Sequence, residues 1–261
     1  MTIPTEVATL INSSGNNFHV KVARWFQTNG WSVVVSPYYM DQTQGKAREI
    51  DLVAERLWPV RHAYSSNLDY VAVRLVIECK YVPGHSVFWF AGKDRDAALD
   101  LVCSTGSFRA NNNYTEKHHY LALSLSVAKL FASSTGRAHE SDPFYKALNQ
   151  VLNAMVSMRG RAVSSSLTKR SGTKPLFVLE YPVVVCNSFA QMFAVEIESD
   201  AAPSPIGDNF QLEARYAYID SVNSPHDEHF LVDFVEFERL PQFADAIDTD
   251  AKAAAYLGSR N

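Results

Sequence analysis

Apolar and polar residues follow one another along this chain with two periods, one helical and one extended. From Phe18 to Phe26 the apolar side chains recur at positions i, i+4, i+7 and i+8, which predicts an amphipathic helix. Asn29 and Gly30 follow this helix as a stop signal. Residues 71–81 instead carry an apolar side chain at every second position, so we expect a strand there.

The remaining segments complete an α/β pattern. We expect further strands over residues 31–36, 49–55, 176–186, 192–197, 215–222 and 230–237, and further helices over residues 93–102, 144–158 and 243–257. The run 119–126 is too short for its period to distinguish strand from helix. These elements predict a single α/β domain over residues 1–261, with helices flanking a central mixed sheet and a C-terminal part rich in strands.

The predicted strand 71–81 ends with an acid and a base two residues apart, Glu78 and Lys80. Because strand side chains alternate, these two project from one face, while the apolar positions from Val71 to Cys79 project from the other. We therefore expect one face to be core and the other to carry chemistry. An acid and a base beside a buried strand are costly unless each has a partner.

A second acid, Asp51, lies on the predicted strand that precedes this one. A long loop over residues 57–69 would let the two strands pair as an antiparallel hairpin. Two carboxylates are sufficient protein charge for Mg²⁺, so we expect Asp51 and Glu78 to bind Mg²⁺, or Mn²⁺ in its place. The backbone carbonyl of Cys79 is a third candidate ligand. If such a cation promotes hydrolysis of a phosphodiester, Lys80 would orient the attacking water and stabilise the negative charge that develops. Lys80 would also help to keep the carboxylates ionised.

The order of these features resembles the PD-(D/E)XK nuclease superfamily, which has the restriction-endonuclease-like fold. An apolar helix, a strand, an acid-bearing strand and a strand ending in Glu78 and Lys80 follow one another over roughly residues 16–90. The resemblance implies that Asp51 and Glu78 bind metal, that Lys80 assists the nucleophile, and that the substrate is DNA more often than RNA. Many members place an acid on the first helix, where this chain has His19. His19 is then a substitute ligand, a phosphate contact or a solvated side chain.

The acid-x-Lys triplet alone is weak evidence for a site, because 28 acids and 10 lysines in 261 residues produce about one such triplet at random. A second triplet, Asp250-Ala251-Lys252, does occur, in an Ala-rich segment with helical character. Its context differs from that of Glu78 and Lys80, which end an alternating strand. The alternative for the latter pair is a structural Glu-Lys contact on an exposed sheet face.

Charge is distributed unevenly along the chain. Residues 1–179 carry 20 Lys and Arg against 13 acids, whereas residues 180–250 carry 2 against 15. A basic body suits a polyanionic substrate, so the acidic third would face elsewhere and could meet a protein partner. The alternative is that charges separated in sequence mix in space. Candidate nucleic-acid contacts besides His19 are Lys93, Arg95, Arg159, Arg161, Lys169 and Arg170, the last four in the basic loop 159–174.

An aromatic run, a polar run, the cysteines and the lack of long apolar runs also bear on binding sites and location. The aromatic run 88–90 either stacks on bases or packs in the core. The run 226–229 has residue types that bind metals, but it follows Ser-Pro and predicts a polar turn. The three cysteines are far apart and suggest neither a disulfide framework nor a zinc site. No apolar run of about 18 residues and no signal-peptide pattern occur, so we expect a cytoplasmic protein.

These features predict a Mg²⁺-dependent nuclease that hydrolyses phosphodiester bonds, with DNA as the expected substrate. A homodimer would provide the two sites that double-strand cutting commonly needs. The alternative is a catalytically inactive module on the same fold that binds nucleic acid or a protein partner. The missing helical acid and the acidic C-terminal third are the observations that favour this alternative.

Overall fold

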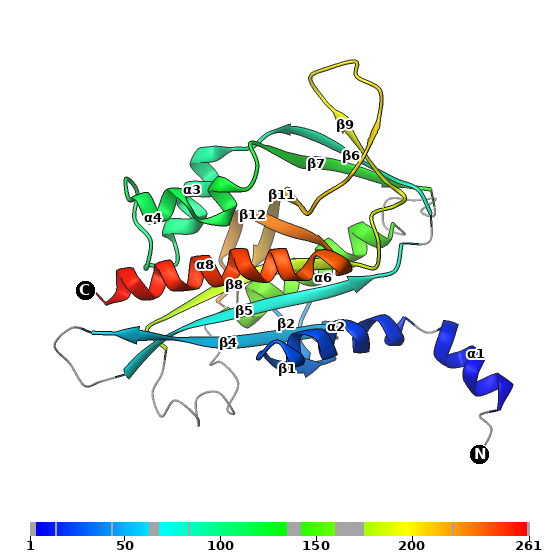
Figure 1. Ribbon diagram of the computed structural model, residues 1–261, viewed down its shortest axis with the longest axis horizontal. Helices are drawn as coiled ribbons and strands as arrows, with labels where there is room; N and C mark the ends of the chain where they lie inside the picture. The colour runs from blue at the N-terminus through cyan, green and yellow to red at the C-terminus, as the bar shows by residue number, and fades with distance from the viewer. Residues whose placement is uncertain are drawn as a thin grey trace.

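The computed structural model describes residues 4–13, 15–42, 44–62, 68–82, 84–134, 142–159, 175–220 and 222–259. Over these residues the protein has an α/β fold in which helices flank one large mixed sheet (Figure 1). The expected fold class, including the strands of the C-terminal part, is thereby confirmed. Within the described ranges, no helix combines the length and the apolar character that crossing a membrane would require.

The strands are β1 Ser32–Val35, β2 Tyr38–Asp41, β3 Lys46–Glu49, β4 Leu52–Arg61, β5 Leu68–Lys80, β6 Ser86–Gly92, β7 Ser126–Ser133, β8 Phe177–Cys186, β9 Met192–Glu196, β10 Ser204–Pro205, β11 Phe210–Ile219 and β12 Pro225–Glu236. The helices are α1 Thr5–Ser13, α2 Asn16–Thr28, α3 Arg95–Cys103, α4 Asn113–Glu116, α5 His119–Ala122, α6 Pro143–Met158 and α8 Leu240–Gly258, with a 3-10 turn, η2, at Phe237–Arg239. In the described part of the chain, ten strands form the main sheet in the order β1-β4-β5-β8-β12-β11-β7-β6-β9-β10, and β2 pairs with β3.

The strands β1, β4 and β5 form an antiparallel meander. Leu52 of β4 lies opposite Ile77 of β5, so the antiparallel pair expected from the sequence is confirmed. The long loop expected over residues 57–69 is wrong, because β4 continues to Arg61 and β5 begins at Leu68. β8 pairs with β5 in parallel along nearly its whole length. A parallel neighbour requires a crossover connection, and α6 is part of that crossover.

β5 is buried on both faces, which corrects the expectation that only one face would be core. The apolar positions of its first face all lie in one core, as predicted: Val71, Val73, Leu75, Ile77 and Cys79. On the opposite face Arg74, Val76 and Glu78 are buried as well. Strands on both sides and helices on both faces enclose β5. An exposed sheet face is therefore excluded as the setting of Glu78.

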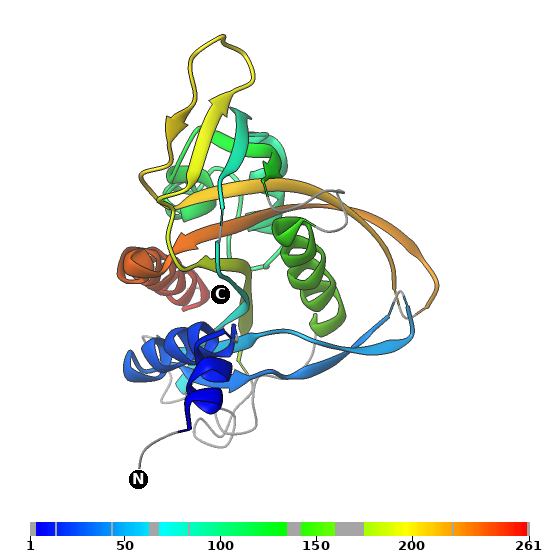
Figure 2. The ribbon, with the colours of Figure 1, turned by 90° about the vertical axis from the view of Figure 1, so that its right-hand side faces the viewer.

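Helices α2 and α8 cover one face of the sheet and α6 covers the other (Figure 2). Figure 2 also shows α6 between the long β11–β12 hairpin and the β2–β3 hairpin, which curve around it. Two tyrosines tie the hairpins to this helix. Tyr216 Oη donates to Asn153 Oδ1 at 2.5 Å, and Tyr39 Oη donates to the carbonyl of Gln150 at 3.4 Å. The β2–β3 hairpin is thus fixed on the face of the sheet that carries Glu78.

The helices expected from periodicity are present, with ends shifted by a few residues. α6 begins at Pro143 because the Asp142 carboxylate accepts hydrogen bonds from the backbone N–H groups of Phe144 and Tyr145, at 2.8 and 3.3 Å. Residues 119–126, for which the sequence favoured neither helix nor strand, contain both. The helix α5 occupies the start of this segment, and the strand β7 begins at its last residue. Helical spacing alone could not separate the two.

The sequence prediction missed β2 and β6 and covered only part of β4, β11 and β12. The polar turn predicted over residues 226–229 is wrong, because β12 begins at Pro225 and passes through this run. The turn lies just before it, where Asp220 Oδ1 accepts a hydrogen bond from the Ser224 N–H at 2.8 Å. In β6, Phe88 and Phe90 are buried in the core that faces α6, so core packing is confirmed for this pair of aromatic residues.

The acidic segment 180–250 pairs with the rest of the molecule through strands and ion pairs. Its strands β8 and β12 lie in the middle of the sheet. Several of its acids pair with cations from the first 179 residues, and three such contacts are Glu180 with Arg74 at 2.8 Å, Glu213 with Lys129 at 2.6 Å and Glu228 with Arg159 at 2.8 Å. These acidic and basic residues, which are separated in sequence, therefore lie together in the fold, as the alternative interpretation expected. A protein partner of the acidic segment stays a prediction.

Candidate functional site

Asp51 lies at a bend where the chain passes from the β2–β3 hairpin into the main sheet. The Ser36 N–H donates to the carbonyl of Asp51 at 2.8 Å across this bend, and Ser36 has a φ of 50°, in the left-handed region. Asp51 directly precedes β4. Since Leu52 pairs with Ile77, the antiparallel register places Asp51 opposite Glu78. The two acids that were predicted to share a cation therefore lie close together, but Asp51 lies at the bend before β4 and not on the strand expected over residues 49–55.

Hydrogen bonds hold the acids and Lys80 in place. Asp51 Oδ2 accepts from the backbone N–H of Cys79 at 2.8 Å, and Lys80 Nζ donates to Glu78 Oε2 at 2.8 Å. The carbonyl of Cys79 lies on the same edge of β5 as its N–H, so this predicted backbone ligand also faces Asp51. The side chains of Asp51 and Lys80 are 16% and 19% exposed, against 1% for Glu78. Solvent thus reaches the site past Asp51 and Lys80, and Glu78 lies deepest.

Burial determines the charge of Glu78. Desolvation raises the pKa of this carboxyl group to about 7, with Lys80 opposing the shift and Asp51 adding to it. Lys80 thus lowers the pKa of Glu78, as we expected from the sequence, but one cation does not outweigh desolvation. Burial also acts to lower the pKa of Lys80, but the Glu78 carboxylate prevails and raises it. Lys80 stays charged while Glu78 titrates near neutral pH.

One oxygen of Glu78 has no partner. Oε1 is buried and accepts no hydrogen bond, whereas Oε2 accepts from Lys80. An unpaired buried acceptor costs free energy that a bound group can recover. A hard cation fits this oxygen, since its preferred ligands are carboxylate and carbonyl oxygens. The residues present therefore suit Mg²⁺ or Mn²⁺.

Helix α2 presents His19 to the site, where the resemblance led us to expect an acid. His19 Nε2 lies 3.3 Å from Asp51 Oδ2, and its side chain is 20% exposed. His19 shares a side of α2 with the buried Val22 and Phe26, three and seven residues on. The interpretation of His19 as a freely solvated residue is therefore wrong. Helix α2, the start of β4 and the end of β5 together supply four side chains.

Three of the other predicted nucleic-acid contacts lie in the described residues, outside the group that these four side chains form. Lys93 follows β6, and Arg95 begins α3, a helix that packs against β12, two positions from β5 in the sheet. Arg159 follows α6, whose last carbonyl accepts a hydrogen bond from Arg74, six residues before Lys80. Three more lie outside the described residues: Arg161, Lys169 and Arg170. A role for these six residues along a bound nucleic acid stays a prediction.

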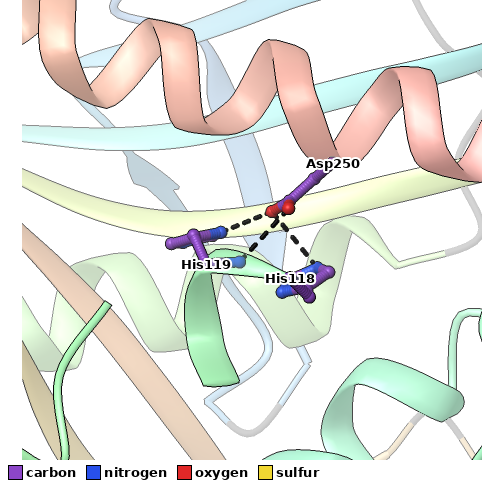
Figure 3. Close-up of side chains that lie close together, drawn as sticks. All are labelled: His118, His119 and Asp250. Carbon is purple, nitrogen blue, oxygen red and sulfur yellow. Dashed lines mark hydrogen bonds and ion pairs between the residues drawn. The ribbon is translucent and has the colours of Figure 1, made fainter. Parts of the chain in front are cut away.

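A second polar cluster, which we did not predict from the sequence, lies where α5, β12 and α8 meet (Figure 3). His118, His119 and Asp250 have donor atoms within 4.8 Å of one another, and they form the one such group of His, Cys, Asp or Glu found in the described ranges. All three are buried. His119 Nδ1 lies 2.5 Å from Asp250 Oδ2, and His119 Nε2 lies 3.0 Å from Asp233 Oδ2. The acid of the chance triplet is thus a partner of two histidines.

Hydrogen bonding accounts for every ring nitrogen in this cluster. Burial acts to lower the pKa of His119, but Asp233 and Asp250 prevail and raise it to about 10, so both ring nitrogens donate. His118 Nδ1 accepts from the N–H of Tyr120 at 3.2 Å, which leaves the proton on Nε2, 3.3 Å from Asp250. Burial lowers the pKa of His118 to about 3, so it stays neutral. Neither histidine therefore has a free lone pair for a metal ion.

A hollow of about 1030 Å³ lies between β8 and β12, and His118 of the second polar cluster is part of its lining. These strands pair only from Val183 opposite Asp233 to Cys186 opposite Glu236, and they diverge before those residues. The hollow is lined by parts of both strands, α3 and the end of α6, and its lining includes none of the four side chains of the candidate site. It is a separate feature of the molecule.

The fold and the site define an α/β protein with two acids, a lysine and a histidine gathered at the end of a central strand. No protein family, curated protein or solved structure matches this chain. The interpretation of the site therefore rests on its geometry.

Proposed function

We propose that the protein is a metal-dependent nuclease that hydrolyses phosphodiester bonds, with DNA as its substrate. The observation that carries the proposal is the carboxylate of Glu78, which is buried beside Lys80, lies opposite Asp51 and has one oxygen without a partner. A buried acceptor without a partner destabilises the fold unless a ligand satisfies it, so this oxygen is the atom at which a cation would bind.

The residues of the site divide the chemistry between them. Asp51 and Glu78, with the backbone carbonyl of Cys79, would hold Mg²⁺ or Mn²⁺. When bound, such an ion neutralises phosphate charge and lowers the pKa of a bound water. Lys80 is 19% exposed and can donate hydrogen bonds both to Glu78 and toward solvent, so it would orient the attacking water and stabilise negative charge as it develops.

The arrangement of the elements supports the same proposal. The order on which the resemblance to the PD-(D/E)XK superfamily rests is present as α2, β1, Asp51 with β4, and β5 with Glu78 and Lys80. The antiparallel meander brings the two acids together from opposite directions of the chain. Membership of that superfamily, a homodimer and DNA as the substrate are parts of the proposal.

One observation favours a second candidate function, a catalytically inactive module that binds nucleic acid. His19 stands where an acid was expected, and Asp51 Oδ2 already accepts a hydrogen bond from Cys79. With one acid fewer, and with Asp51 Oδ2 already bonded to a backbone N–H, the site would bind a cation less tightly. The two functions differ in whether added metal produces cleavage or only binding.

A cleavage panel separates the candidates. Purified protein is incubated with single-stranded, duplex and branched DNA and with RNA, in Mg²⁺, in Mn²⁺ and in excess chelator. We expect metal-dependent cleavage of a DNA substrate, and loss of cleavage with retained fold in Asp51→Ala, Glu78→Ala and Lys80→Ala. Full activity of the Asp51 and Glu78 variants would exclude this site. A change in substrate mobility without cleavage would favour the binding module.

A further inference from the structure

The hollow between β8 and β12 lies where the sheet loses its hydrogen-bonded ladder. β8 pairs with β12 only from Val183 onward, and Pro182, the residue before it, has no N–H to donate to a neighbouring strand. Ahead of Pro182, β8 pairs with β5 on one side and with no described strand on the other. The hollow that results measures about 1030 Å³, which is the size of a pocket for a small-molecule ligand.

Two side chains of its lining have a buried polar atom without a partner. Tyr120 is only 3% exposed, and its Oη forms no hydrogen bond with the residues that the structure describes. His229 Nε2 is also buried and has no hydrogen bond within the described ranges. Tyr120 comes from α5 and His229 from β12, so two separate elements contribute such an atom. A buried polar atom without a partner costs free energy that a bound group can recover.

The charged side chains of the hollow disfavour an anion. The lining holds two arginines and four acids, which are Arg74, Arg159, Asp100, Glu180, Asp227 and Glu228. Arg74 Nη1 donates to Glu180 Oε1 at 2.8 Å, and Arg159 Nη2 lies 2.8 Å from Glu228 Oε2. Burial lowers the pKa of His229, so this side chain is uncharged at neutral pH. An anion would therefore meet more acids than cations, and both arginines are already paired.

Rings form much of the uncharged part of the lining. They belong to His118, Tyr120, Tyr181, His229 and Phe230. Aromatic rings pack favourably against other rings, either stacked with an offset or edge to face. A planar aromatic molecule therefore suits this lining better than a flexible aliphatic one.

We infer that the hollow binds a neutral aromatic molecule whose hydrogen-bonding groups pair with Tyr120 Oη and His229 Nε2. The phenol of Tyr120 can donate to a carbonyl or hydroxyl oxygen of the ligand, and His229 Nε2 accepts or donates according to its tautomer. This binding site goes beyond the proposed nuclease function and does not depend on it, because none of the four side chains of the nuclease-like site lines the hollow.

A matched pair of probes tests the inference. Para-hydroxycinnamamide is a neutral aromatic molecule with a hydroxyl group at one end and an amide at the other. Para-hydroxycinnamate has nearly the same shape but carries a negative charge. Isothermal titration calorimetry measures the dissociation constant of each probe for the wild type and for Tyr120→Phe, Tyr181→Phe and Ala97→Trp, and circular dichroism checks that each variant is folded.

Tyr181→Phe is the matched control for Tyr120→Phe. The ring of Tyr181 also lines the hollow, but its Oη lies 3.4 Å from both His118 Nε2 and Asp250 Oδ2, so it already has partners. Ala97→Trp, on α3, tests the hollow as a whole, because an indole at this position of the lining occupies part of the volume.

We expect the wild type to bind the amide, and to bind the anion about tenfold or more weakly. Tyr120→Phe should bind the amide about tenfold more weakly without losing stability, since it removes a hydroxyl group that has no hydrogen bond in the free protein. Tyr181→Phe should bind the amide as the wild type does, and Ala97→Trp should bind it far more weakly.

Three results would overturn the inference. No binding of the amide by the wild type, or binding that Ala97→Trp leaves unchanged, overturns the hollow as the binding site. Equal affinity for the amide and the anion overturns the neutral class of the ligand. An equal loss of affinity in Tyr120→Phe and Tyr181→Phe overturns the role of the unpaired hydroxyl group.

Discussion

Two clusters of acids and bases lie in this molecule, and they differ in what their polar atoms do. The nuclease-like site consists of Asp51, Glu78, Lys80 and His19, while the histidine cluster consists of His118, His119, Asp233 and Asp250. In the histidine cluster every ring nitrogen has a partner, and each of the four side chains is less than 5% exposed. In the nuclease-like site one buried carboxylate oxygen lacks a partner, and three side chains reach solvent.

The difference separates a structural cluster from a candidate site. The histidine cluster joins α5, β12 and α8 through satisfied hydrogen bonds, which stabilises the fold but leaves no atom for a ligand. The nuclease-like site keeps a buried acceptor unpaired next to three side chains that reach solvent, and an unpaired buried acceptor costs stability unless a group binds to it. The two acid-x-Lys triplets of the sequence fall one in each cluster, so the triplet alone does not identify the functional one.

The largest effect should come from the histidine cluster. His119→Ala leaves the buried carboxylates of Asp233 and Asp250 without their cation, so we expect a loss of about 3–5 kcal/mol in the free energy of unfolding, measured by urea denaturation. His226→Ala, which breaks the more exposed pair with Asp220, should lose much less. Equal losses in the two variants would contradict a structural role for the histidine cluster.

The two lysines of the triplets provide the next comparison. Lys80→Ala should lower metal-dependent cleavage by about 10²–10³-fold, equivalent to about 3–4 kcal/mol, because it removes a donor positioned at the reacting group. Lys252→Ala should leave the rate unchanged, since Lys252 is exposed and pairs with Asp248 on α8. The measurement is the initial rate on the best substrate of the cleavage panel. Similar rates for the two variants would refute the proposed function of Lys80.

The pH dependence of stability tests the unpaired carboxyl group. The pKa of Glu78 is raised from 4.5 to about 7, so between these pH values the folded protein binds a proton that the unfolded chain has lost. This contribution is full below pH 4.5 and falls by about 3 kcal/mol as the pH rises through 7. His118 acts oppositely, because its pKa of about 3 destabilises the fold as the pH falls below 6.5.

The comparison with Glu78→Gln isolates the first of these effects. Urea denaturation from pH 4 to pH 8 should show the wild type losing stability relative to the variant as the pH rises, while the contribution of His118 cancels. Parallel pH profiles would mean that Glu78 is ionised in the folded protein throughout this range. Its unpaired oxygen would then need a different explanation.

The smallest effect is expected at Arg95. This residue is about half exposed and forms an ion pair with Glu116, which is also exposed, so Arg95→Ala should change the free energy of unfolding by no more than about 0.5 kcal/mol. Since Arg95 begins α3, outside the group formed by Asp51, Glu78, Lys80 and His19, cleavage should also be unchanged. A strong loss of DNA affinity in this variant would instead extend the nucleic-acid surface across the sheet.

The sequence predicted those parts of the fold that local periodicity determines. The helical spacing from Phe18 to Phe26 produced α2, and the alternation over residues 71–81 produced β5. The position of Asp51 beside Glu78 followed from two consecutive strands that pair antiparallel, although the loop expected between them was too long. The burial of the second face of β5 did not follow, because α6 covers it from a segment about 70 residues later in the chain.

The histidine cluster could not be predicted from the sequence either, because it also depends on contacts between distant segments. His119 and Asp250 are 131 residues apart, and each alone is an ordinary residue of a helix. The unpaired oxygen of Glu78 was equally hidden, since it depends on where Lys80 and Asp51 point. Contacts between distant segments and the satisfaction of single atoms are properties of the folded molecule.

Nicking of supercoiled plasmid by wild-type protein and Glu78→Gln, in Mn²⁺ and in excess chelator, tests the central claim most directly. Glu78→Gln keeps the size of the side chain but removes its negative charge, and circular dichroism confirms that the variant is folded. The account predicts Mn²⁺-dependent nicking by the wild type and background nicking by the variant. Equal nicking by both proteins, or no nicking by the wild type in any metal, would contradict it.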